Sequence, residues 1–126
     1  MDLREISTPA LAYLGDCVLE LCVRKHLIEQ GFATSRSLNA EALRFVRASS
    51  QAEAMKHILP ALTETETAYF RRGRNIGHTN VPKSATVSEY CAATGMEVLF
   101  GYLHLSDQAE RIEELFRIGY INIKPE

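Results

Sequence analysis

The chain has 126 residues, of which 46% are hydrophobic and 24% charged, and its formal net charge at pH 7 is −2. This length and composition predict one ordinary soluble domain covering residues 1–126. No apolar run approaches the roughly 18 residues of a membrane span, and the first residues lack the basic and apolar segments of a secretory signal. We therefore expect a cytoplasmic protein that does not associate with a membrane.

Apolar residues recur at helical spacing along most of the chain, which predicts an all-α fold. The first helix is expected over residues 9–30, with Pro9 in its first turn and Gly31 after its end. A second helical stretch is expected over residues 37–59, with a break at residues 48–50 and Pro60 at its end. The candidate core residues of these segments are Leu11, Leu14, Val18, Leu21, Cys22, Leu38, Leu43, Phe45, Val46, Met55, Ile58 and Leu59.

Two capping boxes, Thr63 with Glu66 and Thr86 with Glu89, predict the starts of two further helices. The first of these helices is expected to reach about residue 72 and the second about residue 105, with a loop over residues 73–83 between them. A last helix is expected over residues 107–118, before an irregular tail in which only residues 120–123 alternate as a strand would. Further core candidates are Val87, Tyr90, Cys91, Val98, Leu99, Tyr102 and Leu103.

The three cysteines, Cys17, Cys22 and Cys91, all lie inside apolar helical patterns. Their number is odd, and they lack the paired short spacing of a zinc site. We therefore interpret them as buried free thiols of a protein in a reducing compartment.

The charge is distributed unevenly along the chain. Residues 67–88 contain no acid and carry four positive charges, so with a total of −2 the rest of the chain carries −6. A basic loop on an acidic body is typical of a segment that contacts RNA. The alternative is a solvated connector whose charges only keep the protein soluble. The charged residues are Arg71, Arg72, Arg74 and Lys83.

Two carboxylates stand alone in apolar helical segments, each near a glycine. Asp16 follows Gly15 directly, and Glu97 follows Gly95 by two residues. Because Asp and Gly both disfavour a helix interior, their presence indicates that function overrides helix propensity there, and the glycine would let a metal ion or an RNA backbone approach. Since an unpaired carboxylate is not fully buried, two such acids on two helices could face one another and hold a hard cation.

Structural alternatives stay open for these acids. Asp16 could pair with Arg24 or with a partner helix. Glu20 and Glu89 could each join the site, although a solvated position on a helix face is the simpler interpretation for both. Of the four histidines, we interpret only His78 as a phosphate contact and the others as surface residues.

Two segments resemble the ribonuclease III superfamily. Residues 14–20 resemble its leucine-glycine-aspartate signature, and residues 93–101 resemble its second acidic helix. The resemblance is to the Mini-ribonuclease III family in residues 10–16, in the sequence Arg-Arg-Gly-Arg-Asn at residues 71–75, and in residues 93–95, which lead into Glu97 and residues 101–103. These motifs span residues 10–105 with family-like spacing.

The resemblance implies an all-helical ribonuclease III endonuclease domain that acts as a homodimer and lacks the double-stranded-RNA-binding domain. It implies Mg²⁺ held by Asp16 and Glu97, and no organic cofactor. It also implies cleavage of double-stranded RNA near stem ends to mature the large-subunit (23S) ribosomal RNA precursor, leaving 5′-phosphate and 3′-hydroxyl ends. The expected RNA contacts are Arg71, Arg72, Arg74, Asn75, His78 and Lys83.

The chain departs from the wider superfamily at Ala12 and Thr94, where a glutamate and an aspartate are usual. Both losses fit the Mini branch and leave fewer direct carboxylate ligands. A further superfamily acid is not placed here, although Glu41 lies in the right region. Two other functions compete: a catalytically silent member that only binds structured RNA, and a helical interaction module in which the acids form salt bridges. Retention of Asp16 and Glu97 argues against the silent member.

Overall fold

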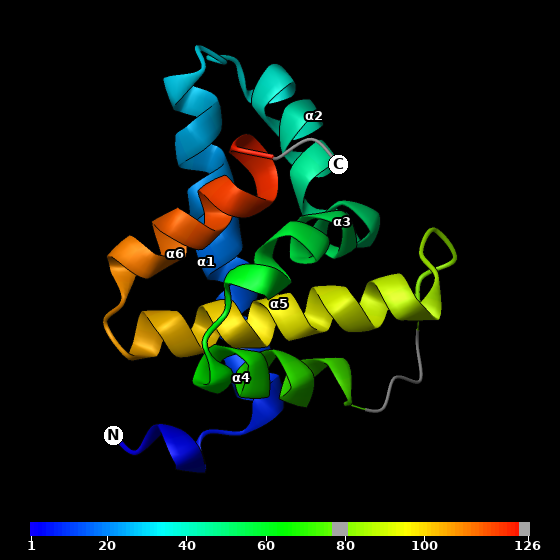
Figure 1. Ribbon diagram of the computed structural model, residues 1–126. Helices are drawn as coiled ribbons and strands as arrows, with labels where there is room; N and C mark the ends of the chain where they lie inside the picture. The colour runs from blue at the N-terminus through cyan, green and yellow to red at the C-terminus, as the bar shows by residue number, and fades with distance from the viewer. Residues whose placement is uncertain (77–80, 124–126) are drawn as a thin grey trace.

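A computed structural model describes residues 1–76 and 81–123, and all regular structure within these ranges is helical (Figure 1). The prediction of an all-α fold is confirmed. None of the helices in these ranges combines the length and the apolar character that crossing a membrane requires. The elements are η1 (Leu3–Glu5), α1 (Thr8–Glu29), α2 (Ser35–Val46), α3 (Ala48–Ile58), η2 (Leu59–Ala61), α4 (Glu64–Arg74), α5 (Val87–Leu105), α6 (Ala109–Phe116) and η3 (Arg117–Ile121).

Side-chain caps begin α1, α4 and α5 within one residue of their predicted starts, whereas α2 begins at Ser35, two residues earlier than predicted. Ser7 caps α1 by accepting a hydrogen bond from the N–H of Ala10 at 3.2 Å. Both capping boxes are formed: Glu66 and Glu89 each accept a hydrogen bond at 2.9 Å from the N–H of the threonine that caps their helix. Glu89 is therefore engaged at the start of α5, which favours the structural interpretation of this acid.

The central helix is α5, which packs against α1, α3 and α4 (Figure 1). Residues on all of its sides are buried, as in a helix enclosed by others rather than one that lies on a surface. Its fully buried Met96, Leu99 and Phe100 share one hydrophobic core with residues of the surrounding helices. The position of α5 therefore determines how the other helices present their side chains.

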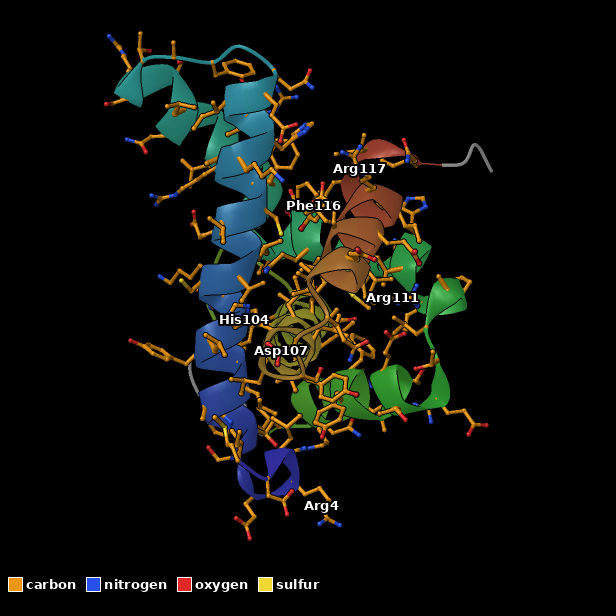
Figure 2. The ribbon with its side chains drawn as sticks, turned by 90° about the vertical axis from the view of Figure 1, so that its left-hand side faces the viewer. Arg4, His104, Asp107, Arg111, Phe116 and Arg117 are labelled. Carbon is orange, nitrogen blue, oxygen red and sulfur yellow. The ribbon has the colours of Figure 1, made fainter. Side chains whose placement is uncertain are left out.

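An ion pair between the half-buried Arg111 and the buried Glu66 joins α6 to the start of α4. Arg111, labelled in Figure 2, donates from Nη2 to Oε1 of Glu66 at 2.8 Å and from Nε to Oε2 at 2.9 Å. The same guanidinium donates to the carbonyl of Ala61 at 2.7 Å. Its hydrogen bonds lower the pKa of Glu66, so this buried carboxylate remains charged.

Several predicted boundaries change. The break in the second helical stretch is present, but at Arg47, whose extended backbone (ψ 152°) separates α2 from α3. The fourth helix continues to Arg74, so the loop starts two residues later than predicted. The helical structure at the end of the chain extends beyond the predicted residue 118, because η3 continues α6 as a π-helical turn through Ile121, where an irregular tail was expected.

Four predicted core residues are exposed: Leu21 (66%), Leu43 (58%), Leu59 (39%) and Val87 (63%). The prediction that all three cysteines are buried is also wrong, because Cys17 is exposed and the other two are half-buried. On α1 the reason is geometric. Its apolar residues occupy more of the helix circumference than a single core covers.

Candidate active site

The contact between α1 and α5 is made by backbone atoms. A Cβ atom on Gly15 would lie 1.6 Å from the carbonyl oxygen of Glu97, and a Cβ atom on Gly101 would lie 2.1 Å from the carbonyl oxygen of Leu11. Only glycine fits at both positions, because a backbone carbonyl cannot rotate away as the end of a flexible side chain can. Gly15 thus accommodates the backbone of α5, and not a metal ion or an RNA backbone as the sequence suggested.

This crossing brings Asp16 of α1 beside Glu97 of α5. Asp16 is exposed and Glu97 is half-buried. Burial, together with the charge of Asp16 and a hydrogen bond to it, raises the pKa of Glu97 to about 8. Neither carboxylate forms an ion pair with any residue in the described ranges. Two carboxylates held together in this way need a shared proton or a cation.

The donor set fits a hard cation. Carboxylate oxygens are the ligands that Mg²⁺ prefers in proteins, and Mg²⁺ usually keeps several of its waters. The described residues contain no group of three or more His, Cys, Asp or Glu side chains that could hold a metal. The hydroxyl of Thr94 donates at 3.0 Å to the carbonyl of Tyr90 within its own helix. One chain therefore brings together two candidate ligands, Asp16 and Glu97.

The other acids that the sequence associated with the site are paired elsewhere. Oε2 of Glu20 lies 3.1 Å from Nε of Arg24, and Oε2 of Glu41 lies 3.3 Å from Nη1 of Arg44. The alternative in which Asp16 pairs with Arg24 is therefore not observed.

The three arginines of α4 have different surroundings. Arg71 and Arg74 are exposed, whereas Arg72 turns toward the start of the chain. Nη2 of Arg72 donates to the Thr8 hydroxyl at 3.0 Å and to the carbonyl of Ile6 at 3.2 Å. We therefore keep Arg71 and Arg74 as candidate RNA contacts and assign Arg72 a structural role between α4 and the segment before α1.

The remaining candidate RNA contacts follow α4. Asn75 is exposed at the end of the helix, and its side-chain oxygen accepts a hydrogen bond from Nε of Arg74 at 3.2 Å. Lys83 is exposed in a turn before α5, and His78 lies outside the described residues. Two cationic side chains of α4 and Lys83 of the following turn are thus available to solvent.

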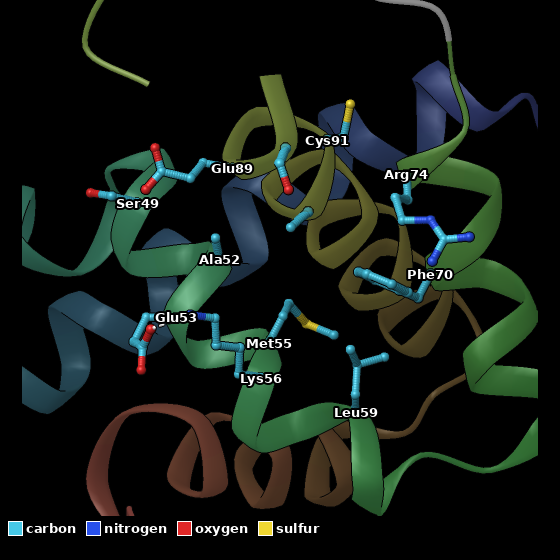
Figure 3. Close-up of a pocket in the computed structure, with 12 residues that line it drawn as sticks. Ser49, Ala52, Glu53, Met55, Lys56, Leu59, Phe70, Arg74, Glu89 and Cys91 are labelled. Carbon is cyan, nitrogen blue, oxygen red and sulfur yellow. Dashed lines mark ion pairs between the residues drawn. The ribbon is translucent and has the colours of Figure 1, made fainter. Parts of the chain in front are cut away.

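Arg74 also borders a pocket of about 520 Å³ between α3, α4 and α5. Figure 3 shows Arg74 and Phe70 on one side of this pocket, Glu89 and Ser49 on another, and Met55 on its floor. None of its described lining residues is Asp16 or Glu97. The pocket is therefore separate from the carboxylate pair.

Comparisons with known proteins agree with this arrangement. Residues 9–108 match the family model described as the ribonuclease III domain. The chain is 49% identical over 107 residues to the Mini-ribonuclease 3 of Symbiobacterium thermophilum, covering 85% of this chain and 82% of that relative. It is 40% identical over 130 residues to the Mini-ribonuclease 3 of Enterococcus faecalis, covering 98% of each.

A solved structure gives the same result for the fold. The crystal structure of a protein from Fusobacterium nucleatum matches with a TM-score of 0.83 and 33% identity over 93% of each chain. The family match includes α1 from Pro9 onward and the whole of α4 and α5, and hence Asp16 and Glu97. The chain belongs to the ribonuclease III family, in its Mini-ribonuclease 3 branch, and is an endoribonuclease.

Proposed function

We propose that this endoribonuclease depends on Mg²⁺ and cleaves double-stranded RNA as a homodimer, with Asp16 and Glu97 as its catalytic residues. The observation that carries the proposal is the pair itself. Two carboxylates from separate helices meet at a backbone-limited crossing, and neither has a cationic partner among the described residues. Membership of the ribonuclease III family supports a phosphodiester as the bond on which this pair would act.

In the proposed mechanism, Asp16 and Glu97 would hold the ion at the point where α1 and α5 cross. Burial and the neighbouring Asp16 raise the pKa of Glu97, and a cation held between the two carboxyl groups would favour its charged form. When bound, Mg²⁺ lowers the pKa of a water molecule and stabilises the leaving 3′-oxygen. Because both carboxylates sit on packed helices, little reorganisation is needed at the moment of reaction.

The exposed cations bind the substrate by its backbone. Double-stranded RNA offers its shape, phosphates and 2′-hydroxyls to a protein, rather than base edges in its deep groove. The guanidinium groups of Arg71 and Arg74 match phosphate oxygens in fork geometry. Asn75, His78 and Lys83 would extend this contact along the strand. The proposal includes cytoplasmic maturation of the 23S ribosomal RNA precursor, as the family resemblance implies.

An exposed apolar face of α1 supports the dimer. Tyr13, Leu21 and Ile28 are 86%, 66% and 63% exposed, and their spacing of eight and seven residues places them on one side of the helix. Asp16 lies three residues from Tyr13, next to this face. A two-fold partner that covers the face would bring a second carboxylate pair close to the first, so that each pair cuts one RNA strand.

Light scattering with an activity assay on the same sample tests the dimer. We expect a dimer at micromolar concentration that cleaves duplex RNA. A monomer with full activity on duplex RNA would show that the exposed face of α1 serves another purpose.

One assay separates the competing functions. Purified protein is incubated with a perfect RNA duplex and with the single strand, each with and without Mg²⁺, and the ends of the products are identified. We expect cleavage of the duplex only with Mg²⁺, leaving 5′-phosphate and 3′-hydroxyl ends. Binding without cleavage would indicate the silent member of the family, and the absence of both would indicate an interaction module.

A further inference from the structure

The two helices that carry the carboxylates touch through two reciprocal glycine contacts. Gly15 of α1 receives the carbonyl of Glu97, and Gly101 of α5 receives the carbonyl of Leu11. We propose that Gly101, together with Gly15, is a positioning residue that sets the separation of the Asp16 and Glu97 carboxylates. The inference rests on the proposed function, because it concerns the ion that these carboxylates would hold.

The two contacts lie one helical turn apart. Leu11 and Gly15 are four residues apart on α1, and Glu97 and Gly101 are four residues apart on α5. The contacts therefore lie about one turn, or roughly 6 Å, apart along each helix. A single contact would leave the helices free to pivot about it. Two contacts one turn apart fix the distance between the helices, their relative rotation and their register.

Both contacts are made with backbone carbonyl oxygens. A methyl group on Gly101 would lie 2.1 Å from the carbonyl oxygen of Leu11, whereas ordinary contact begins at 3.4 Å. The contact at Gly15, at 1.6 Å from the carbonyl oxygen of Glu97, is tighter still. Neither partner can change rotamer, so the helices themselves must separate. A displacement of about 1 Å at a preorganised site is enough to impair metal binding and turnover.

The chain offers a matched control in Gly73. A Cβ atom there would lie 2.7 Å from the Cα atom of Gly95, so this contact is also limited by backbone, but it joins α4 to α5 and does not involve α1. Gly119 offers a milder control, because its Cβ would lie 2.7 Å from Cδ1 of Ile58, the end of a flexible side chain. Each substitution by alanine adds the same methyl group in a helix.

The test measures binding of Mn²⁺ alone, without RNA, by electron paramagnetic resonance on the full chain. Mn²⁺ takes the same hard oxygen ligands as Mg²⁺. We expect Gly101→Ala to weaken Mn²⁺ binding by about 10- to 100-fold, as for residues that orient metal ligands. Gly73→Ala and Gly119→Ala should bind Mn²⁺ as the wild type does. On duplex RNA, Gly101→Ala should lower kcat and leave KM unchanged.

Stability is followed in parallel through Tm, since every variant loses some packing. Where Gly101→Ala is partly unfolded, the measurement is repeated at low temperature and in trimethylamine N-oxide, which favours the compact state. Equal Mn²⁺ affinities for Gly101→Ala and Gly73→Ala would overturn the proposal, as would a Gly101→Ala chain that folds in none of these conditions. Failure of the proposed function is distinguishable, because the wild type itself would then neither bind Mn²⁺ nor cleave duplex RNA.

Discussion

The crossing of α1 and α5 and the exposed end of α4 perform their proposed tasks by different physical means. At the crossing, backbone contacts through Gly15 and Gly101 place two carboxyl groups side by side on packed helices. At the end of α4, Arg71 and Arg74 extend into solvent. The difference fits the two proposed roles, because metal ligands require precise placement on packed helices, whereas side chains that bind a phosphate backbone tolerate more conformational freedom.

Residues of the same chemical type in α4 also have different surroundings. Arg72 lies between Arg71 and Arg74 in the chain, yet it donates hydrogen bonds to Thr8 and Ile6, and its guanidinium carbon lies 5.1 Å from the centre of the Tyr69 ring. A basic cluster in the sequence is therefore not a single functional unit.

The largest expected effect comes from breaking the carboxylate pair. Glu97→Gln keeps the shape of the side chain but removes a charge that holds the ion, so cleavage of duplex RNA should fall by several orders of magnitude. The double variant with Asp16→Asn should be hardly worse than either single variant, because residues that act as one unit are non-additive. Single-turnover rates would measure this, and multiplicative losses would show that the two carboxylates act separately.

A smaller effect is expected at the end of α4. Replacing Arg71 and Arg74 by Ala should weaken RNA binding by on the order of tenfold at about 0.1 M salt, by a similar factor for different duplex sequences. Each lost phosphate contact should reduce the slope of log affinity against log salt by roughly 0.7–0.9. Turnover at saturating RNA should change much less than in Glu97→Gln, since these groups bind substrate and transition state alike.

The control for that experiment is Arg117→Ala, which removes an arginine that is paired with Glu113 on α6 and lies far from α4 in Figure 2. It should leave both affinity and salt slope unchanged. If the double variant of α4 behaves in the same way, the RNA surface must be sought elsewhere, with the face that bears Arg44 and Arg47 as the next candidate.

The raised pKa of Glu97 predicts how stability depends on pH without metal. The folded protein keeps this proton up to about pH 8, whereas the unfolded chain loses it near the ordinary value of 4.5. Between these values the folded state binds more protons, so the free energy of unfolding should decrease as pH rises. The measurement is Tm in a chelator, compared between wild type and Glu97→Gln. In Glu97→Gln, Tm should not show the part of the decrease with pH that the Glu97 carboxyl group causes. Identical curves of Tm against pH for the two proteins would contradict the raised pKa of Glu97.

The smallest effect on RNA should come from Arg72→Ala. The variant loses the hydrogen bonds to Thr8 and Ile6, so its free energy of unfolding should decrease by about 1 kcal/mol. Its affinity for duplex RNA should match that of the wild type. Chemical denaturation and RNA titration on the same preparation would check both. A loss of affinity like that of the Arg71 and Arg74 variant would return Arg72 to the RNA surface.

Much of the fold could be predicted from local patterns. The capping boxes located the starts of α4 and α5, and Asp16 and Glu97 stood out because each is a lone acid near a glycine in an apolar helix. These signals are local, since a cap or a helix-disfavouring residue acts within one or two turns.

What could not be predicted depends on contacts distant in the chain. The sequence showed that something approaches Gly15, but not that it is the backbone of residue 97. The inward turn of Arg72 depends on Thr8, which is 64 positions away. Gly101 lies four residues after Glu97 and hence on the same side of the helix, but spacing identifies a face and not its partner. The exposure of Leu21 could not be predicted for the same reason, because apolar spacing does not show whether another helix covers that face.

The central claim is that Asp16 and Glu97 together hold the ion that cleavage requires. Asp16→Asn tests it most directly, because Asp16 is exposed and its replacement by an amide of the same shape should leave the fold and the dimer intact. Cleavage of a perfect RNA duplex is measured over a range of Mg²⁺ concentrations for the wild type and the variant. We predict Mg²⁺-dependent cleavage by the wild type and a loss of several orders of magnitude at every Mg²⁺ concentration in the variant. A folded, dimeric variant that keeps more than about a tenth of the wild-type rate would contradict the account.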